Sequence, residues 1–237
     1  MPSPASVVKT NIVSFSGIDG SGKSTQIDAL RDRLKQEGVE VKVIRFWDDV
    51  ARLTSLRESA GHKLFKGDKG VGSPEAPLNR RDKNVQSWPM SGVRLFIYFV
   101  DAISTRIAVN KARRSGAGLV IFDRFIHDEL ANLNLANPAN RAYARMIMAL
   151  VPRLPIHYLL DADPEKARAR KPEYPLEFLH FNRNAYLALN RLIGGMTVIE
   201  PMPIADVTRT IAGHAFSRLS FRTQPRNGNN STLNVTA

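Results

Sequence analysis

Short apolar runs alternate with amphipathic segments along most of the chain. Apolar runs predict five strands, at residues 11–17, 39–47, 119–123, 156–161 and 197–200. Apolar positions at helical spacing predict helices over 23–37, 92–114, 139–150, 175–193 and 205–219. Because the strands are apolar throughout and alternate with helices, we expect an α/β fold with helices on both faces of a parallel sheet.

The length of 237 residues suits one domain. We expect this domain to span 11–220, between an N-terminal extension at 1–10 and a polar tail at 221–237 that its composition predicts to be disordered. A basic insertion at about 61–92 interrupts the pattern, with seven Lys or Arg against three acids between Gly61 and Arg94. An acceptor-site flap, a partner-binding loop and disorder are all compatible with such a segment.

The composition adds positive charge and excludes some chemistry. A net charge of +12 predicts attraction to anions, including nucleotides and nucleic acid, although solvated surface charge is an equal alternative. The absence of cysteine excludes disulfides and thiol nucleophiles, and the scattered histidines suggest no protein-bound metal. Without a secretory signal or a bilayer-length apolar run, we expect a cytoplasmic protein with no membrane partner.

The first predicted strand runs into FSGIDGSGKST (15–25), which matches the phosphate-binding pattern G-x-x-x-x-G-K-[ST]. Glycines let the backbone wrap an anion, and the start of the next helix adds partial positive charge. Lys23 would reach the β- and γ-phosphates of ATP, and the Ser24 hydroxyl would bind Mg²⁺. The predicted ATP-phosphate contacts are Gly17, Asp19, Gly20, Ser21, Gly22, Lys23, Ser24 and Thr25. A glycine-rich turn without a ligand is the alternative.

Two further features follow the third and fourth predicted strands. Asp123 and Arg124 end the third strand, where open parallel sheets gather ligand groups, so Asp123 can hold Mg²⁺ and Arg124 can meet a phosphate. A short basic helix in DPEKARARK (163–171) carries Arg168 and Arg170, which could close over ATP as a lid. Solvated charge is the alternative for both features. Together with the phosphate loop they predict phosphoryl transfer, which needs cations rather than a covalent nucleophile.

These motifs resemble the thymidylate kinase family of P-loop nucleoside monophosphate kinases. The resemblance covers about 11–200 and rests on FSGIDGSGKST, IRF (44–46), VIFDRF (120–125) and LLDADPEKARAR (159–170) followed by EFLHFNRNAYLAL (177–189). It implies a three-layer P-loop kinase fold with a five-stranded parallel sheet and a lid, at about 163–175, after the fourth strand. It also implies a homodimer that transfers the γ-phosphoryl group of Mg·ATP to a nucleoside monophosphate, with dTMP first among candidates.

The resemblance also implies roles for single residues. Asp19 lies where the family places an acid near the acceptor, and Gly20 stands where some members carry a catalytic arginine, a part that lid arginines then take. The catalytic set it implies is Asp19, Lys23, Asp123, Arg168 and Arg170. The acceptor-binding set is Arg45, Phe46, Tyr98, Arg106 and Arg124.

Several residues differ from the family pattern, so the chemical identity of the acceptor is not decided by the resemblance. Ala102 stands where members often carry an arginine, and Arg106, one turn further on the same helical face, could substitute, with solvation the alternative. Asp128, Asn132 and Leu133 stand where the family favours a serine and a Tyr-Gln pair. A kinase of a nucleoside, another nucleotide or a sugar derivative is therefore an alternative. So is a nucleotide-binding regulatory or nucleic-acid-associated protein with weak turnover, although nucleic acid is the less favoured partner.

Overall fold

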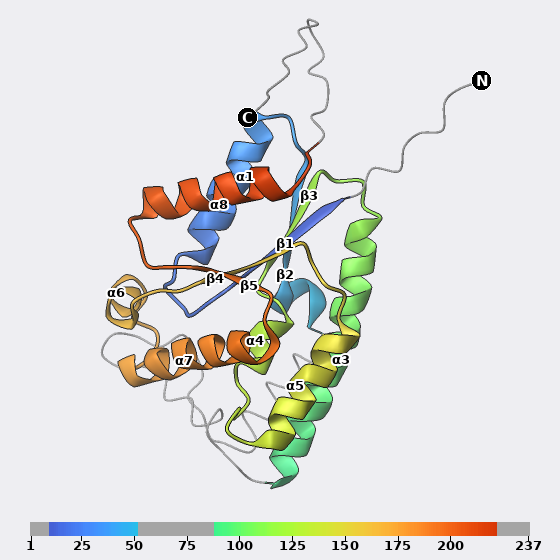
Figure 1. The fold of residues 1–237 in the computed structure, drawn as a ribbon, viewed down its shortest axis with the longest axis vertical. Helices are drawn as coiled ribbons and strands as arrows, with labels where there is room; N and C mark the ends of the chain where they lie inside the picture. Colours follow the sequence, from blue (N-terminus) through green and yellow to red (C-terminus); the bar gives the residue numbers. More distant parts are fainter. Residues whose placement is uncertain (1–9, 52–87, 222–237) are drawn as a thin grey trace, which may run out of the picture.

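The computed structural model describes residues 10–51 and 88–221 (Figure 1). Most of the basic insertion, the extension and the tail lie outside these described residues, so the predicted domain limits stay predictions. The strands are β1 Asn11–Ser16, β2 Val41–Arg45, β3 Leu119–Asp123, β4 Ile156–Leu160 and β5 Met196–Ile199. Every neighbouring pair is parallel, in the order β2-β3-β1-β4-β5. The predicted five-stranded parallel sheet is confirmed.

Helices cover both faces of this sheet. The helices of the described residues are α1 Lys23–Gln36, a π-helical turn η1 Phe46–Val50, α3 Trp88–Arg113, α4 Ile126–Leu130, α5 Pro138–Leu150, α6 Pro164–Arg170, α7 Leu176–Ile193 and α8 Ile204–Arg218. Figure 1 shows α1 and α8 on one face of the sheet and α3, α4, α5 and α7 on the other. The predicted three-layer α/β fold is therefore confirmed. None of the helices in the described ranges is long and apolar enough to span a membrane.

Alternate residues of β1 enter the two core layers. Val13 and Phe15 pack with α1 and α8, whereas Ile12 packs with the layer of α3 and α5. Phe15 is paired in register with Asp123 of β3 and with Tyr158 of β4. The carboxyl ends of the three central strands consequently meet at one edge of the sheet, where ligand groups collect in open parallel sheets.

Two short helices were not predicted, and one corrects a predicted strand. The second strand, expected to reach residue 47, ends at Arg45, because Phe46 and Trp47 wind into η1. The Arg45 N–H donates to the Asp49 carboxylate at 2.7 Å, which stabilises this turn. The five-residue α4 follows β3 directly and is too short for its apolar spacing to be recognised in the sequence.

Two buried histidines pack beside Phe125. His127 of α4 and His157 of β4 meet edge to face with ring centroids 4.6 Å apart, and His157 Nδ1 lies 2.7 Å from Ser14 Oγ. Burial lowers the pKa of His127 to about 4, and burial with the neighbouring His127 lowers the pKa of His157 well below 6.5. Both rings are therefore neutral at neutral pH.

We expect the histidine pair to make folding acid-sensitive. In the unfolded chain a histidine takes up a proton near pH 6.5, whereas in the folded chain His127 does so only near pH 4. The free energy of unfolding is therefore unaffected above pH 6.5 and falls as the pH drops toward 4. His127→Phe should remove about 2 kcal/mol of this loss at pH 4.5, measured as urea unfolding midpoints between pH 7.5 and 4.5. His180→Gln, at an exposed position of α7, should keep the wild-type acid sensitivity. Equal pH slopes for wild type and His127→Phe would contradict this prediction.

Candidate active site

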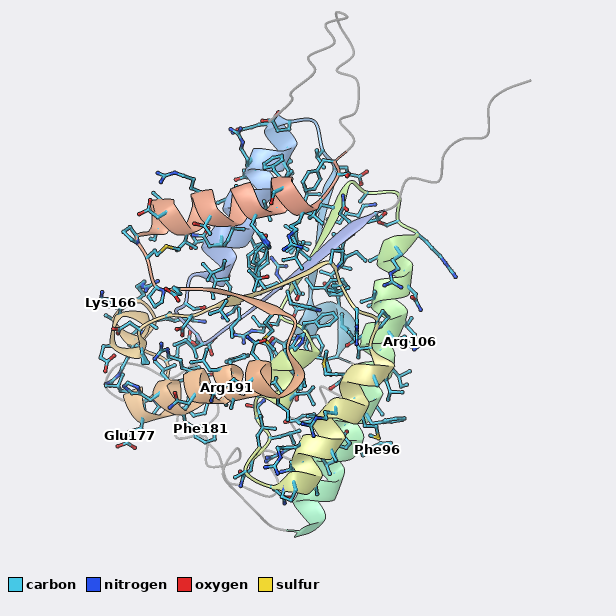
Figure 2. The ribbon with its side chains drawn as sticks, in the orientation of Figure 1. Phe96, Arg106, Lys166, Glu177, Phe181 and Arg191 are labelled. Atoms are coloured by element: carbon cyan, nitrogen blue, oxygen red, sulfur yellow. The ribbon has the colours of Figure 1, made fainter. Side chains whose placement is uncertain are left out.

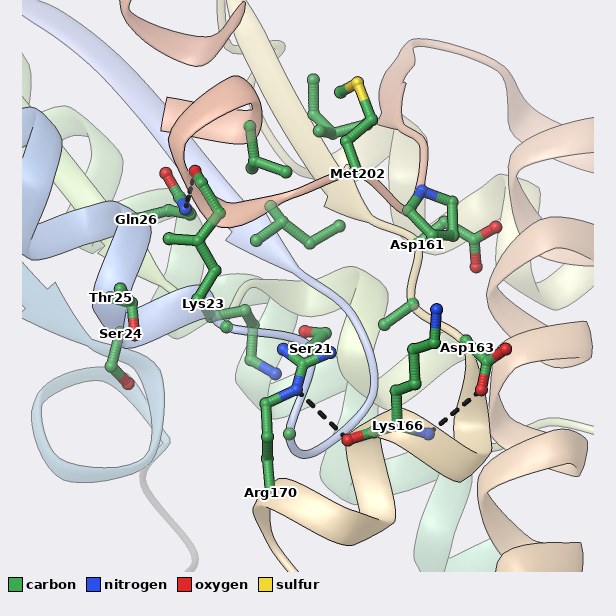
Figure 3. Close-up of a pocket in the computed structure, with 18 of the residues that line it drawn as sticks. Ser21, Lys23, Ser24, Thr25, Gln26, Asp161, Asp163, Lys166, Arg170 and Met202 are labelled. Atoms are coloured by element: carbon green, nitrogen blue, oxygen red, sulfur yellow. Dashed lines mark hydrogen bonds between the residues drawn. The ribbon is translucent and has the colours of Figure 1, made fainter. Parts of the chain in front are cut away.

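A cavity of about 820 Å³ opens at the carboxyl edge of the central strands. Its lining comes from the turn between β1 and α1, the ends of β3 and β4, helix α6 and the segment after β5. In Figure 3, Arg170 extends from α6 to beside Ser21 of the turn, Lys166 extends from α6 into the cavity, and Met202 lies on the side away from α6. Cations thus line one side of the cavity and apolar side chains the other.

Three glycines give the β1–α1 turn its curvature. Gly17, Gly20 and Gly22 have φ of 144°, 78° and 92°, in the region that favours glycine. Gly22 is the N-cap of α1, and no side chain of the described residues caps that helix end. The first N–H groups of α1 are therefore suited to bind an anion.

Lys23 lies buried beneath this turn. Its ammonium donates to the carbonyl oxygens of Gly17 and Ile18, both at 2.8 Å. Burial lowers the pKa of Lys23 to about 8, and the nearby Arg124 charge adds to this effect. The Ser21 hydroxyl is also buried, lines the cavity and has no hydrogen-bond partner among the described residues. An ammonium and an unpartnered hydroxyl in a glycine-rich turn fit the oxygens of nucleotide phosphates.

Three oxygen-bearing side chains line the cavity at the start of α1 and at the end of β3. Ser24 and Thr25 are exposed in the first turn of α1 and line the cavity, as does Asp123 at the end of β3. Burial raises the pKa of Asp123, although Arg124 and Lys23 partly oppose this shift. Hydroxyl and carboxylate oxygens fit Mg²⁺. Within the described part of the chain, no cluster of three or more His, Asp or Glu could hold a metal ion, so phosphates and water would have to complete its ligands.

Arg124 joins two carboxylates at the end of β3. Its backbone is left-handed, with φ 69°, and its N–H donates to the Phe15 carbonyl oxygen at 2.9 Å. One terminal nitrogen binds the Asp19 carboxylate, and the other donates to Asp128 Oδ1 at 3.1 Å. Burial opposes the charge of Arg124, but Asp128 and Asp19 outweigh it and raise its pKa above the usual range. Burial likewise opposes ionisation of Asp19, whose pKa Arg124 and Lys23 nevertheless hold below the usual range.

Helix α6 rests directly on the phosphate loop. Asp163 caps it by accepting hydrogen bonds from the N–H groups of Glu165 and Lys166, both at 3.0 Å. A Cβ added at Gly20 would lie 2.2 Å from the carbonyl oxygen of Ala167. Only glycine at position 20 therefore allows α6 to pack this closely.

Three cations reach the cavity from α6 and its C-terminal end. Arg170, predicted as a lid residue, lines the cavity, whereas Arg168, predicted beside it, is not among the lining residues. Lys166 and Lys171 line the cavity but were not predicted. The sequence held a signal for Lys166, because it lies four residues before Arg170 and shares its helical face.

The chain is similar to known proteins over most of its length. No protein-family model matches the chain. A protein of Pyrobaculum aerophilum named probable thymidylate kinase is 26% identical over 211 residues, or 83% of this chain and 88% of its own length. A protein of the same name from Methanosphaera stadtmanae is 25% identical over 197 residues, or 81% and 90% of the two chains. The chain is therefore similar, over most of its length, to two proteins that carry this name.

The predicted acceptor residues do not gather at one place in the structure. Arg124 lines the cavity, while Arg45 is exposed at the end of β2 and does not line it. Phe46 and Tyr98 are 0% and 5% exposed and belong to the hydrophobic core. Their positions are explained by packing.

The structure gives Arg106 a different role from the predicted one. Its guanidinium donates to the carbonyl oxygen of Leu150 at 3.0 Å and so binds the C-terminal end of α5. Figure 2 shows it on α3 beside that end of α5, away from α6. Arg106 does not line the cavity in this structure, and Ala102 is fully buried, so an acceptor contact by Arg106 stays a prediction.

The burial of Asp128 and its contact with Arg124 were not predicted from the sequence. It differs from the thymidylate kinase pattern and was interpreted only as a sign of an altered base site. In the structure its carboxylate is buried and contacts Arg124 directly. The nearby Leu133 belongs to the core, and the Asn132 amide donates to the Asp128 carbonyl oxygen at 2.9 Å.

Proposed function

We propose that the chain is a nucleotide kinase that transfers the γ-phosphoryl group of ATP to a nucleoside monophosphate, with dTMP as the first candidate. The observation that carries this proposal is the meeting of Lys23, Ser21 and Arg170 in one cavity at the phosphate loop. The names of the two relatives support nucleotide kinase activity in general, and they are the reason for placing dTMP first.

In the proposed reaction, the phosphate-loop residues hold the donor. Lys23 would leave the Gly17 and Ile18 carbonyls to bind the β- and γ-phosphates, and the Ser21 hydroxyl and the first N–H groups of α1 would bind their other oxygens. Ser24 and Asp123 would hold Mg²⁺, which supplies charge neutralisation between the phosphates when bound.

The lid and the end of β3 would act on the moving group. Arg170 and Lys166 face the loop from α6 and would neutralise charge on the phosphoryl group as its bond to ADP breaks and a bond to an acceptor oxygen forms. Arg168 stays a proposed second lid cation, and Arg124 and Arg45 stay proposed acceptor contacts. An acceptor phosphate is already ionised at neutral pH, so the step needs no general base.

The segment after β5 would hold the donor base. Pro201, Met202 and Ile204 line the cavity and give it an apolar wall. Figure 3 shows Met202 on the side of the cavity away from α6. A planar base can pack on such side chains while its phosphates reach the loop. The cavity volume of about 820 Å³ is within the usual range for small-molecule sites.

An ADP-release assay across candidate acceptors tests this function. The panel contains dTMP, dUMP, UMP, CMP, AMP, GMP, the nucleosides and a sugar, each with Mg·ATP, and Lys23→Ala is the control. We expect dTMP to give the largest acceptor-dependent release. A larger release with a nucleoside or a sugar would instead favour the other small acceptors. If no acceptor exceeds the control, and nucleic acid binds with a steep salt dependence, the protein is a nucleic-acid-associated one.

We also propose that two copies associate through α3. One face of this helix exposes five large apolar side chains at helical spacing, each 38–60% exposed: Val93, Phe96, Phe99, Ile103 and Ile107. Apolar faces of this kind are characteristic of interaction surfaces, and a two-fold axis across α3 would bury the face on both copies.

Sedimentation velocity at micromolar concentration tests the association. Wild type should sediment as a dimer, and the double variant Phe96→Glu, Ile107→Glu as a monomer, because four charges would meet in the interface. Phe181→Glu is the matched control, since Phe181 is an exposed phenylalanine on α7 (54% exposed; Figure 2) and should leave the dimer intact. A monomeric wild type would contradict the proposal.

A further inference from the structure

A buried carboxylate lies directly behind the candidate site. The Asp128 side chain is 2% exposed, and Asp128 does not line the cavity. Its Oδ1 accepts hydrogen bonds from Arg124 Nη1 at 3.1 Å and from the Tyr186 hydroxyl at 2.7 Å. Its Oδ2 accepts from Ser16 Oγ at 2.7 Å and from the Phe125 N–H at 3.1 Å. A carboxylate has about four acceptor positions, so this one is fully used.

Two of the four donors, Arg124 and Phe125, lie within four residues of Asp128, and the other two come from distant elements, so together they fix the direction of the carboxylate. Ser16 ends the central strand β1, Phe125 precedes α4, and Tyr186 lies on α7. Helix α7 is held in turn by Arg183, whose Nε and Nη2 donate to the two Asp161 oxygens at 2.6 and 2.7 Å. Asp128 therefore cannot turn to follow a moving partner without breaking several hydrogen bonds at once.

Arg124 binds two carboxylates, of which one is exposed to the cavity and the other is buried. Asp19 is 20% exposed and lines the cavity, whereas Asp128 is buried behind it. An anion that enters the cavity can compete with Asp19 for the guanidinium but cannot reach the side that Asp128 binds. The Arg124 backbone is also fixed, by its hydrogen bond to the Phe15 carbonyl oxygen.

We propose that Asp128 is a positioning residue that holds the Arg124 guanidinium so that its other edge faces an anionic substrate in the cavity. The identity of that anion as a phosphate-bearing acceptor rests on the proposed function. The positioning itself rests only on the hydrogen bonds of Asp128 and on the difference in exposure between Asp128 and Asp19.

Side-chain NMR of Arg124 tests the positioning without any substrate. In wild type the guanidinium should rotate slowly about its Nε–Cζ bond, and Asp128→Asn, which keeps the volume and removes the charge, should speed this rotation about tenfold or more. Ser16→Ala is the matched control, because it removes a neutral donor from Oδ2, the oxygen that does not bind Arg124. Equal rotation in wild type and Asp128→Asn would overturn the proposal. If Asp128→Asn does not fold, Asp128→Ser carries the same test and the same expected result.

Kinetics with the best acceptor give the second test. Asp128→Asn should raise the acceptor KM about tenfold or more and leave the KM for ATP within about twofold. Because Asp128 acts through Arg124, the double variant Asp128→Asn, Arg124→Ala should be no worse than Arg124→Ala alone. Additive losses would overturn the proposal. If wild type shows no acceptor-dependent ADP release, the proposed function fails, whereas the NMR result still decides the positioning.

Discussion

Lys23→Ala will lower kcat/KM for ADP release by about a hundredfold or more, the cost typical of removing one preorganised charge donor from a transition state. The ammonium is buried and donates to the Gly17 and Ile18 carbonyl oxygens, so it lies beside the proposed position of the donor phosphates. Steady-state ADP release with the best acceptor measures the effect. The melting temperature of each variant separates loss of chemistry from loss of fold.

The lowered pKa of Lys23 gives this prediction a pH signature. Since that pKa is about 8, the side chain is charged below pH 8 and loses its charge above it. If the charge is required, wild-type kcat/KM for ATP should fall about tenfold per pH unit above pH 8, because this parameter reports the free enzyme. Lys42→Ala removes the same charge from the exposed lysine of β2 and should keep wild-type rates. A Lys23→Ala variant with wild-type kcat/KM would contradict the assignment of Lys23 to the donor phosphates.

Gly20→Ala will displace the lid and lower both stability and activity. The new Cβ would lie 2.2 Å from the Ala167 carbonyl oxygen, and position 20 has a φ of 78° that side chains rarely adopt. The backbone strain alone costs about 1–3 kcal/mol, which lowers the melting temperature by roughly 2–4 °C per kcal/mol in a chain of this size. Because α6 carries Arg170 and Lys166, its displacement should also lower kcat/KM about tenfold or more.

Gly116→Ala separates the two causes. Gly116 has nearly the same φ, 72°, but an added Cβ would meet nothing within 4 Å. This variant should therefore show the backbone strain without the contact, with a smaller fall in melting temperature and wild-type kcat/KM. If Gly20→Ala and Gly116→Ala behaved alike in both measurements, close packing of α6 on the loop would have no part in the activity.

The sheet and the phosphate loop could be predicted because their patterns are local. The strands are continuous apolar runs, and the loop motif lies between a strand and a helix. The sequence also showed that Arg168 and Arg170 are about 200° apart around a helix, so that both could act at the loop only if α6 moved. In the structure only Arg170 of the two lines the cavity.

The acceptor side could not be predicted, because it depends on contacts between distant segments. The sequence alone cannot distinguish an aromatic residue of a binding site from one of the core. The structure places Phe46 and Tyr98 in the core. Arg106 reaches a carbonyl 44 residues away along the chain. Asp128 contacts Arg124 and Phe125 within four residues of itself, but its other partners, Ser16 and Tyr186, lie 112 and 58 residues away along the chain.

The strand order β2-β3-β1-β4-β5 also bears on how such a protein can diverge. Most of the proposed donor groups follow β1, β4 and β5, and Asp123 at the end of β3 is the exception. The proposed acceptor contacts are Arg45, at the end of β2, and Arg124, directly after β3. The central strand thus divides the carboxyl edge into two halves that can vary separately. Substitutions in the β2–β3 half could select a different acceptor while the other half binds the same phosphate donor. Acceptor specificity can therefore change in this fold without changes to the residues that bind the donor.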